Sequence, residues 1–308
     1  MKLEEKERIL IVGAGSKAAA AIKEVLAAET PYELFFVEYM VSDQSKAEGV
    51  IEASFTNRKE IRDICLQIRP SVIVNTAAYT NVDKSEHEKQ EAWVVNVKGV
   101  ENLVQMSRLV DAHLIHFSTD YIFDGTKGPY TEEDKPNPLG YYGKTKLASE
   151  NVCKAGNIHF TIIRTNVLYG STGPVHQDFV SWLLAKLDKG EQVKVVNDQF
   201  SNPTLVDDLG IAVERIIKRK RYGIYNIAGA DWLNRWEFAG KIADFFSLNK
   251  ELIIPITTDE LGQSAPRPRY GGLVTLKAET DLRMKMSGIE NGLSMIKQRL
   301  LRNARERR

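Results

Sequence analysis

The first half of the chain alternates short, almost uninterrupted apolar runs with longer stretches in which apolar residues recur every three or four positions. The short runs, which we read as strands, cover 9–12, 34–37, 72–75, 113–118 and 160–164. The longer stretches, which we read as helices, cover 16–28, 58–68, 86–110 and 142–154. Strands without a polar face are covered on both sides, so the pattern predicts an α/β fold with a doubly wound parallel sheet.

The second half has a less regular pattern. Helical periodicity covers 178–188, 206–219 and 234–246, and short apolar runs occupy 193–196, 223–227 and 252–255. We expect two parts: a domain at 1–165 that contains the sheet, and a smaller, partly interleaved lobe at 166–308 that closes over it. Parallel sheets bind ligands at the carboxyl ends of their strands, so the residues just after each strand are the candidates for a site.

A glycine loop follows the first strand. Residues 13–18 read Gly-Ala-Gly-Ser-Lys-Ala and match G-x-G-x-x-A, in which glycines let the backbone approach a pyrophosphate at a helix N-terminus. This position favours a Rossmann-like dinucleotide site, with contacts from Gly13, Gly15, Ser16 and Lys17. The side chain of Lys17 either adds a phosphate contact or points to solvent.

Two further segments extend the predicted cofactor site. Glu38 ends the second strand, where a carboxylate bonds a ribose hydroxyl and favours NAD, but the nearby Lys46 leaves the choice between NAD and NADP open. After the strand at 72–75, the small residues Ala77 and Ala78, followed by Tyr79, suit close approach of a planar cofactor.

The candidate catalytic residues lie at the same sheet edge. Tyr142 and Lys146 are four residues apart on an expected helix and therefore share one face, although chance alone produces such pairs. Thr119 follows the strand at 113–118 and supplies a hydroxyl. Together with the glycine loop, these residues predict carbonyl reduction: Thr119 holds the carbonyl oxygen, Tyr142 donates the proton, and Lys146 lowers the pKa of the phenol and holds the nicotinamide ribose.

A longer series of motifs makes the likeness to a family specific. The matching stretches, in order, are 68–75, 77–84, 118–125, 142–148, 164–165, 168–170, 198–200, 203–204, 236–239 and 267–268. From about residue 9 to about residue 273, the chain resembles the extended short-chain dehydrogenases/reductases and, within them, the dTDP-4-dehydrorhamnose reductases.

The resemblance implies an NAD(P)H-dependent oxidoreductase that reduces a nucleotide-linked 4-keto-6-deoxy sugar, with dTDP-4-dehydro-L-rhamnose as the default substrate and dTDP-L-rhamnose as the product. It implies that Thr119, Tyr142 and Lys146 form the catalytic trio. The substrate contacts that it implies are Val82, Asp83, Thr119, Asp120, Val167 and Arg267. The planar fork of Arg267 suits a diphosphate.

Several positions depart from the family pattern. The family's glycine loop usually carries two further glycines, where this chain has Ser16 and Ala18-Ala19. Val167 stands where a tryptophan packs on the substrate sugar. Gly271 replaces a serine, Gln177-Asp178 replaces paired asparagines, and the acidic residue expected at 53–54 near the adenine is missing. The catalytic residues are kept while the substrate side differs, which indicates retained chemistry and leaves the sugar and the nucleotide open.

Two alternatives remain. A nucleotide-sugar epimerase or dehydratase with tightly bound NAD would use the same fold, but such dehydratases carry an Asp-Glu pair where this chain has Asp120 and Tyr121. A non-catalytic NAD(P)-binding regulatory subunit, like the beta subunit of methionine adenosyltransferase, would also use it. The retained catalytic side chains count against this second alternative.

Composition restricts the partners. The chain has 308 residues, 43% hydrophobic and 27% charged, with a net charge of +1, so we expect a small-molecule substrate and neither a nucleic-acid nor a membrane partner. The basic tail at 299–308 is expected to be a solvated helix end. Two cysteines and a charged N-terminus indicate a cytoplasmic protein, and no residues have metal-ligand spacing. The oligomeric state stays open, a homodimer included.

Overall fold

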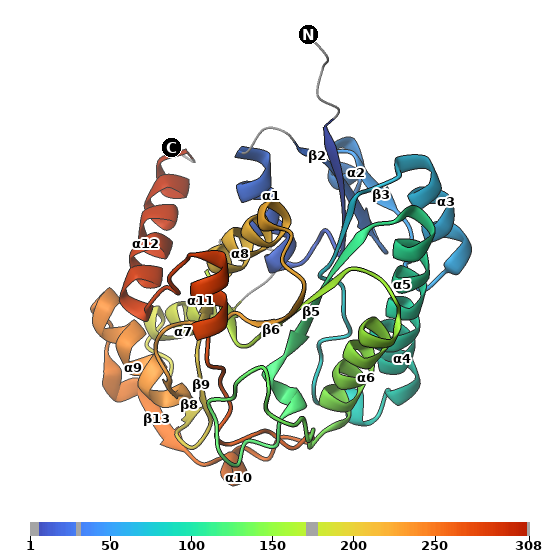
Figure 1. Cartoon of the computed structure of the whole chain (residues 1–308). Helices are drawn as coiled ribbons and strands as arrows, with labels where there is room; N and C mark the ends of the chain where they lie inside the picture. The colour runs from blue at the N-terminus through green and yellow to red at the C-terminus, as the bar shows by residue number, and fades with distance from the viewer. Residues whose placement is uncertain (1–5, 29–31, 171–177, 307–308) are drawn as a thin grey trace.

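The computed structural model describes residues 6–28, 32–170 and 178–306. Its centre is a seven-stranded sheet in the order β11-β6-β5-β4-β1-β2-β3, and every neighbouring pair is parallel (Figure 1). The strands are β1 (Glu7–Val12), β2 (Tyr32–Glu38), β3 (Val50–Glu52), β4 (Val72–Asn75), β5 (His113–Thr119), β6 (Phe160–Thr165) and β11 (Gly223–Asn226). The predicted α/β fold with a doubly wound parallel sheet is therefore confirmed.

Helices cover both faces of the sheet because alternate residues of each strand are apolar on both sides. Ile9 and Ile11 of β1 pack with α1 (Lys17–Ala28), α8 (Val206–Arg219) and α11 (Leu276–Leu282). Leu10 and Val12 pack on the other side with α3 (Arg58–Ile68), α5 (Gly99–Val110) and α6 (Tyr141–Ala155). The short α2 (Asp43–Ala47) connects β2 to β3.

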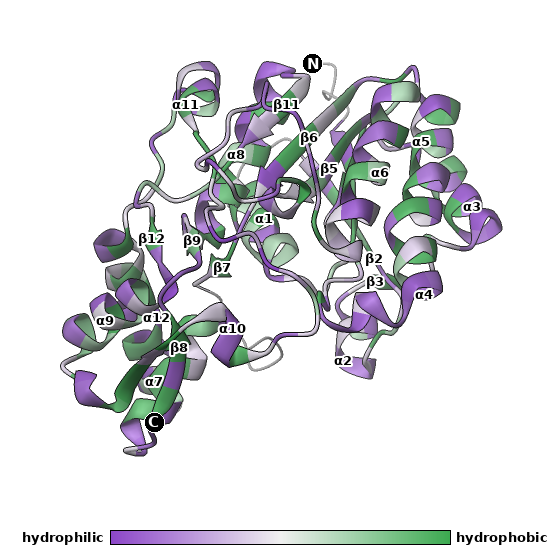
Figure 2. Cartoon of the chain, turned by 90° about the horizontal axis from the view of Figure 1, so that it is seen from below, coloured by the Kyte–Doolittle hydropathy of each residue, from purple (hydrophilic) through white to green (hydrophobic). Residues whose placement is uncertain are grey.

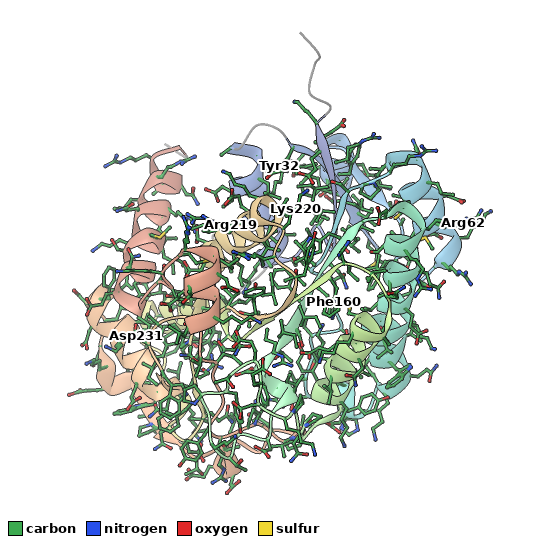
Figure 3. All side chains as sticks on the ribbon, in the orientation of Figure 1. Tyr32, Arg62, Phe160, Arg219, Lys220 and Asp231 are labelled. Carbon is green, nitrogen blue, oxygen red and sulfur yellow. The ribbon has the colours of Figure 1, made fainter. Side chains whose placement is uncertain are left out.

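The strand order reverses between β1 and β4. After β1 the chain builds outward through β2 and β3, then returns to add β4, β5 and β6 on the other side of β1. A reversal of this kind opens a crevice at the carboxyl ends of the strands, and ligands of doubly wound sheets bind there. Figure 3 labels Tyr32, Arg219 and Lys220 at the opposite end, where the strands begin.

The expected single helix at 86–110 is wrong. The structure divides this stretch into a 3-10 turn (Lys84–Glu86), α4 (Lys89–Trp93), a π-helical turn (Val94–Lys98) and α5. The π turn contains the buried Asn96, whose side chain bonds to groups outside the helix. A wider turn of this kind is common where a helical side chain is redirected toward a site.

A smaller part of the molecule lies beside the sheet, below and to the left in Figure 2. A separate apolar core there joins α7 (Phe179–Asp188), α9 (Arg235–Phe246) and α12 (Ile289–Glu306) with the parallel pair β8 (Val193–Val196) and β13 (Ile253–Ile256). Short pairs connect it to the sheet domain: β7 (Leu168–Tyr169) with β10 (Thr204–Leu205), and β9 (Phe200–Ser201) with β12 (Leu233–Asn234). The remaining short elements are 3-10 turns at Asp120–Ile122 and Lys250–Leu252, and α10 (Thr258–Leu261).

Two segments of the second half belong to the sheet layers. Strand β11 pairs with β6, and α8 packs against α1. The division of the chain at residue 165 stays a prediction, and these segments are where the two halves interleave.

The basic tail is not a purely solvated helix end. Arg299 of α12 is three-quarters buried and binds Asp207 of α8 (Nη1–Oδ2 2.9 Å) and the Gly170 carbonyl oxygen (3.1 Å). It therefore ties α12 to α8. Within the described residues, no helix combines the length and the apolar character needed to cross a lipid bilayer.

Candidate active site

The glycine loop fits closely between the ends of β1 and β4. Gly13 has φ of +89°, and a Cβ there would lie 2.5 Å from the Ala77 backbone nitrogen, so only glycine is accommodated. The N–H of Gly13 donates to the Val37 carbonyl oxygen at 2.9 Å. The loop thus presents backbone rather than side chains at the N-terminus of α1, as a bound pyrophosphate requires.

Ser16, which departs from the family's glycine pattern, turns into the protein. Its hydroxyl donates to Thr76 Oγ1 (2.8 Å) and accepts from the Ala19 N–H (3.0 Å), which caps the first turn of α1. The substitution therefore leaves the ligand side of the loop clear. Lys17 is half-buried, and burial lowers its pKa while Asp178 raises it. A phosphate contact from Lys17 stays a prediction.

The end of β2 carries a carboxylate fixed beside the loop. Glu38 accepts from the N–H groups of Gly15 and Tyr39, both at 2.8 Å. Beyond it lies a cavity of about 560 Å³ lined by Tyr39, Glu52, Ala53, Ser54, Thr56, Asn57 and Glu60. Residues 53–54 lack the acidic side chain of the family, but a carboxylate from α3 lies beside them: Glu60 accepts from the Ser54 N–H at 2.8 Å. The loop, the carboxylate and the cavity together fit a dinucleotide.

Asn96 holds the segment in which Ala77 and Ala78 are predicted to allow close approach of a planar cofactor. Its side-chain oxygen accepts from the Tyr79 N–H (2.8 Å), and its amide donates to the Tyr79 carbonyl (3.1 Å) and to Thr145 Oγ1 (2.9 Å) on α6. The segment with Ala77 and Ala78 is thereby fixed to the helix that carries Tyr142. Sequence reasoning missed Asn96, although an amide in the middle of an apolar helical pattern is a usable signal.

The three candidate catalytic residues come together at the end of β5. Thr119 is the last residue of that strand and is buried, and its hydroxyl interacts with the phenol of Tyr142. The first turn of α6 presses on the chain that follows β5, because a Cβ at Gly143 would lie 2.2 Å from the Tyr121 carbonyl oxygen. Lys146 is buried and donates from Nζ to the Phe117 carbonyl oxygen at 2.7 Å.

The pKa values of Tyr142 and Lys146 differ from those expected from the sequence. Burial raises the pKa of the Tyr142 phenol, Tyr121 and Asp120 raise it further, and the hydroxyl of Thr119 lowers it. Burial also lowers the pKa of Lys146 to about 8. The prediction that Lys146 lowers the pKa of the phenol is therefore wrong for this structure, since desolvation dominates and the ammonium bonds to Phe117. At neutral pH the phenol keeps its proton.

A buried ion pair holds α6 in place behind the site. Glu150, one turn beyond Lys146, binds Arg164 of β6 through two contacts of 2.9 Å, and both side chains are at most 1% exposed. Ser118 Oγ donates to the same carboxylate at 2.7 Å. This fixes the register of α6 against β5 and β6.

Asp120, a predicted substrate contact, has its carboxylate engaged inside the protein. Its Oδ2 accepts from Asn166 Nδ2 and from the Gly272 N–H, both at 3.1 Å, and burial raises its pKa. It thereby fastens residues 271–272 beside Thr119. A Cβ at Gly271 would lie 3.0 Å from this carboxylate, so the glycine found in place of a serine allows the close approach.

Asp83 and Arg267, also predicted substrate contacts, bind each other. The guanidinium makes two bonds to the carboxylate (Nη2–Oδ2 2.7 Å, Nη1–Oδ1 3.2 Å), and the Arg267 side chain is 8% exposed. Burial raises the pKa of Asp83, but bonds from the Ala265 N–H and Arg267 outweigh it and leave the pKa below its usual value. The Arg267 fork expected to be free for a diphosphate is thus engaged by Asp83. The neighbouring Val82 is half-buried.

Val167 occupies an unusual backbone position. It is half-buried and has φ of +27°, which a β-branched residue rarely adopts, and its carbonyl oxygen accepts from the Thr204 N–H at 3.0 Å. Strain of this kind often accompanies a ligand site. A substrate contact from Val167 stays a prediction, and Gln177 lies outside the described residues.

The fold and this arrangement of side chains define the class of extended short-chain dehydrogenases/reductases. The family model described as the RmlD substrate binding domain matches residues 7–301, and the chain belongs to that family. A dTDP-4-dehydrorhamnose reductase of Aggregatibacter actinomycetemcomitans is 30% identical over 94% of this chain and 98% of its own length.

The chain is also similar to a reductase of known structure and to a subunit of a different enzyme. The crystal structure of a dTDP-4-dehydrorhamnose reductase from Bacillus anthracis, in complex with NADP, has a TM-score of 0.83 and 31% identity, and the match covers 94% of this chain and 98% of that one. The methionine adenosyltransferase 2 subunit beta of Bos taurus is 32% identical over 74% of this chain and 70% of its own length. This chain is therefore similar both to reductases and to a subunit of a methionine adenosyltransferase.

Proposed function

We propose that this protein reduces the keto group of a nucleotide-linked 4-keto-6-deoxy sugar, with dTDP-4-dehydro-L-rhamnose as the default substrate. The observation that carries the proposal is the half-buried Tyr142 phenol, which keeps its proton at neutral pH and is hydrogen-bonded with the Thr119 hydroxyl at the end of β5. Similarity to the two dTDP-4-dehydrorhamnose reductases supports the substrate class.

The chain's own residues act on the carbonyl oxygen. Thr119 donates a hydrogen bond to that oxygen, and Tyr142 transfers its phenolic proton to it as the alcohol forms. A nicotinamide cofactor, when bound, supplies the hydride that the carbonyl carbon receives. Lys146 donates one N–H to the Phe117 carbonyl oxygen, and its remaining N–H groups would hold the nicotinamide ribose.

The cofactor is held along the crevice at the strand ends. Gly13, Gly15 and the first turn of α1 would hold the pyrophosphate, and Glu38 would bond the adenine ribose. We propose NADH as the preferred cofactor, because a 2′-phosphate would meet the carboxylate of Glu38 at the end of β2 and those of Glu52 and Glu60, which line the cavity. Lys46, the nearby cation, is already paired with Glu52 at 2.6 Å.

The test is the loss of cofactor absorbance when purified protein is given dTDP-4-dehydrorhamnose with NADH or NADPH in parallel. We expect turnover by the wild type, faster with NADH, and a loss of at least about a hundredfold in kcat for Tyr142→Phe, since that variant has no proton to donate. Tyr141→Phe, which removes the neighbouring hydroxyl on α6, is the matched control. Full activity of Tyr142→Phe would contradict the role of the phenol.

A second candidate is a non-catalytic NAD(P)-binding subunit, favoured by the similarity to the methionine adenosyltransferase 2 subunit beta. The same assay separates the two candidates. A protein of this kind would bind the cofactor without oxidising it, whichever keto sugar nucleotide is offered, and would retain a stable protein partner after purification.

A further inference from the structure

Arg235 is a cation at the active site that the sequence reasoning did not identify. It is the first residue of α9, its backbone N–H donates to the Gln199 carbonyl oxygen at 3.1 Å, and its guanidinium carbon lies 4.9 Å from the centre of the Phe179 ring. Among the described residues, no carboxylate or carbonyl pairs with this guanidinium. The ring holds the fork in one plane and leaves its N–H donors available.

Hydrogen bonds connect this position to the catalytic end of β5. Strand β12, which precedes Arg235, pairs with β9, and the Phe200 N–H in β9 donates to the Arg269 carbonyl oxygen at 2.7 Å. The Gly271 N–H then donates to the Phe200 carbonyl oxygen (3.0 Å), and the Gly272 N–H donates to Asp120 (3.1 Å). Arg235 and the segment that carries Arg267 therefore flank β9 on its two sides, next to Asp120 and Thr119.

The charges around Arg235 do not cancel. Burial lowers its pKa, Tyr121 and Asp120 raise it, and Arg267 lowers it, so these four side chains share one electrostatic environment. Arg267 is neutralised by its two bonds to Asp83, and the Asp120 carboxylate is engaged by Asn166 and Gly272. Arginine stays charged in proteins. One half-buried positive charge thus remains beside Tyr121, whose ring lies 6.0 Å from that of Tyr142.

We propose that Arg235 binds the diphosphate of the nucleotide-sugar substrate. This inference rests on the proposed function and names the residue that recognises the anionic part of the substrate. A desolvated cation is costly unless an anion joins it, and a planar fork bonds two phosphate oxygens at once. Arg267 does not take this role, because Asp83 occupies its fork. Arg267 instead fixes the loop at 264–267 beside Arg235.

Calorimetric titration of dTDP into the full chain, with NADH present, tests the inference directly. We expect dTDP to bind the wild type and its Kd to rise at least about tenfold in Arg235→Gln, which corresponds to one lost charge-assisted contact. Arg235→Lys should fall between the two, since it keeps the charge without the fork. Thymidine, which has no phosphate, should bind the wild type and Arg235→Gln alike.

The matched control is Arg269→Gln. Arg269 is exposed and pairs with the exposed Asp259, so this variant should bind dTDP as the wild type does. An unchanged Kd for NADH in Arg235→Gln would show that the variant is folded. Equal dTDP affinity in the wild type and Arg235→Gln would overturn the inference, and so would a wild type that does not bind dTDP.

The inference and the proposed function fail in different ways. A wild type that binds dTDP through Arg235 but oxidises no cofactor with dTDP-4-dehydrorhamnose would support the inference and contradict the proposed function. A wild type that reduces this sugar, with KM unchanged in Arg235→Gln, would support the proposed function and overturn the inference.

Discussion

At the scale of single residues, the site depends on how burial changes proton affinity. Tyr142 and Lys146 lie on one face of α6, and burial shifts both toward their uncharged forms. The lysine keeps its proton at neutral pH because its pKa of about 8 still lies above it, and the Phe117 carbonyl oxygen accepts one of its N–H bonds. A phenol that keeps its proton at neutral pH is the state that delivers a proton to a carbonyl.

The buried ammonium of Lys146 has a measurable effect on stability. The unfolded chain holds this proton up to about the ordinary pKa of 10.5, whereas the folded chain releases it near 8. Between these pH values the unfolded state binds more protons, so raising the pH favours the folded state. Below pH 8 the full penalty, about 3 kcal/mol, destabilises the protein.

We therefore predict that Lys146→Met is more stable than the wild type at pH 7 and that the difference shrinks by about 3 kcal/mol as the pH rises toward 10.5. Urea unfolding of both proteins across this range measures the difference, and the titrating groups that do not interact with Lys146 cancel in the comparison. A stability difference that does not change with pH would show that Lys146 titrates normally.

Sequence reasoning placed Thr119, Tyr142 and Lys146 at one sheet edge because strand ends and helix periodicity can be read locally. It did not foresee Arg235, which lies 93 residues beyond Tyr142 and reaches the site only through β9 and β12. It also did not foresee that Asp83 occupies Arg267, since an ion pair across 184 positions leaves no local pattern. Tertiary contacts decide which polar side chains are free.

At the scale of elements, the position of α6 decides whether the site forms. Its catalytic face is set by the Glu150–Arg164 ion pair, which is completely buried and bidentate. Losing one partner of such a pair leaves an uncompensated charge inside the protein.

We predict that Arg164→Leu lowers the free energy of unfolding by about 3–5 kcal/mol, because Glu150 loses its buried partner. Lys154, whose side chain is 35% exposed, is the other cation bound to Glu150. Lys154→Leu should therefore lower the free energy of unfolding by no more than about 1 kcal/mol. Denaturant unfolding of the two variants makes the comparison. Similar losses of stability in the two variants would show that the buried ion pair contributes no more than the partly exposed one.

Most element boundaries could be predicted within a few residues, and β4, α3, α8 and β8 agree with the pattern at both ends. The division of the stretch 86–110 into separate helical elements could not be predicted, because its apolar periodicity continues through the π turn. The π turn contains the buried Asn96, which bonds to Thr145 on α6. The short pairs β7–β10 and β9–β12 have two residues per strand. Such strands are too short to show an alternating pattern.

At the scale of the whole molecule, the second half of the chain is interleaved with the first. Strand β11 completes the edge of the sheet and α8 covers β1, while α7, α9 and α12 form the smaller part (Figure 1). The pattern at 223–227 predicted a strand but not its neighbour, since pairing with β6 depends on where the chain returns. The smaller part brings Arg235 and Phe179 toward the catalytic end, so substrate and cofactor would meet between the two parts.

The central claim, that this chain transfers a hydride to a nucleotide-linked keto sugar, is tested most directly by isotope transfer. The protein is incubated with dTDP-4-dehydrorhamnose and NADH deuterated at both C4 positions, and the sugar nucleotide is analysed by mass spectrometry. We predict a reduced product that carries one deuterium on the former carbonyl carbon, formed at least about a hundredfold more slowly with Tyr142→Phe. Intact deuterated NADH beside unreduced sugar, in a wild type that binds both, would contradict the claim.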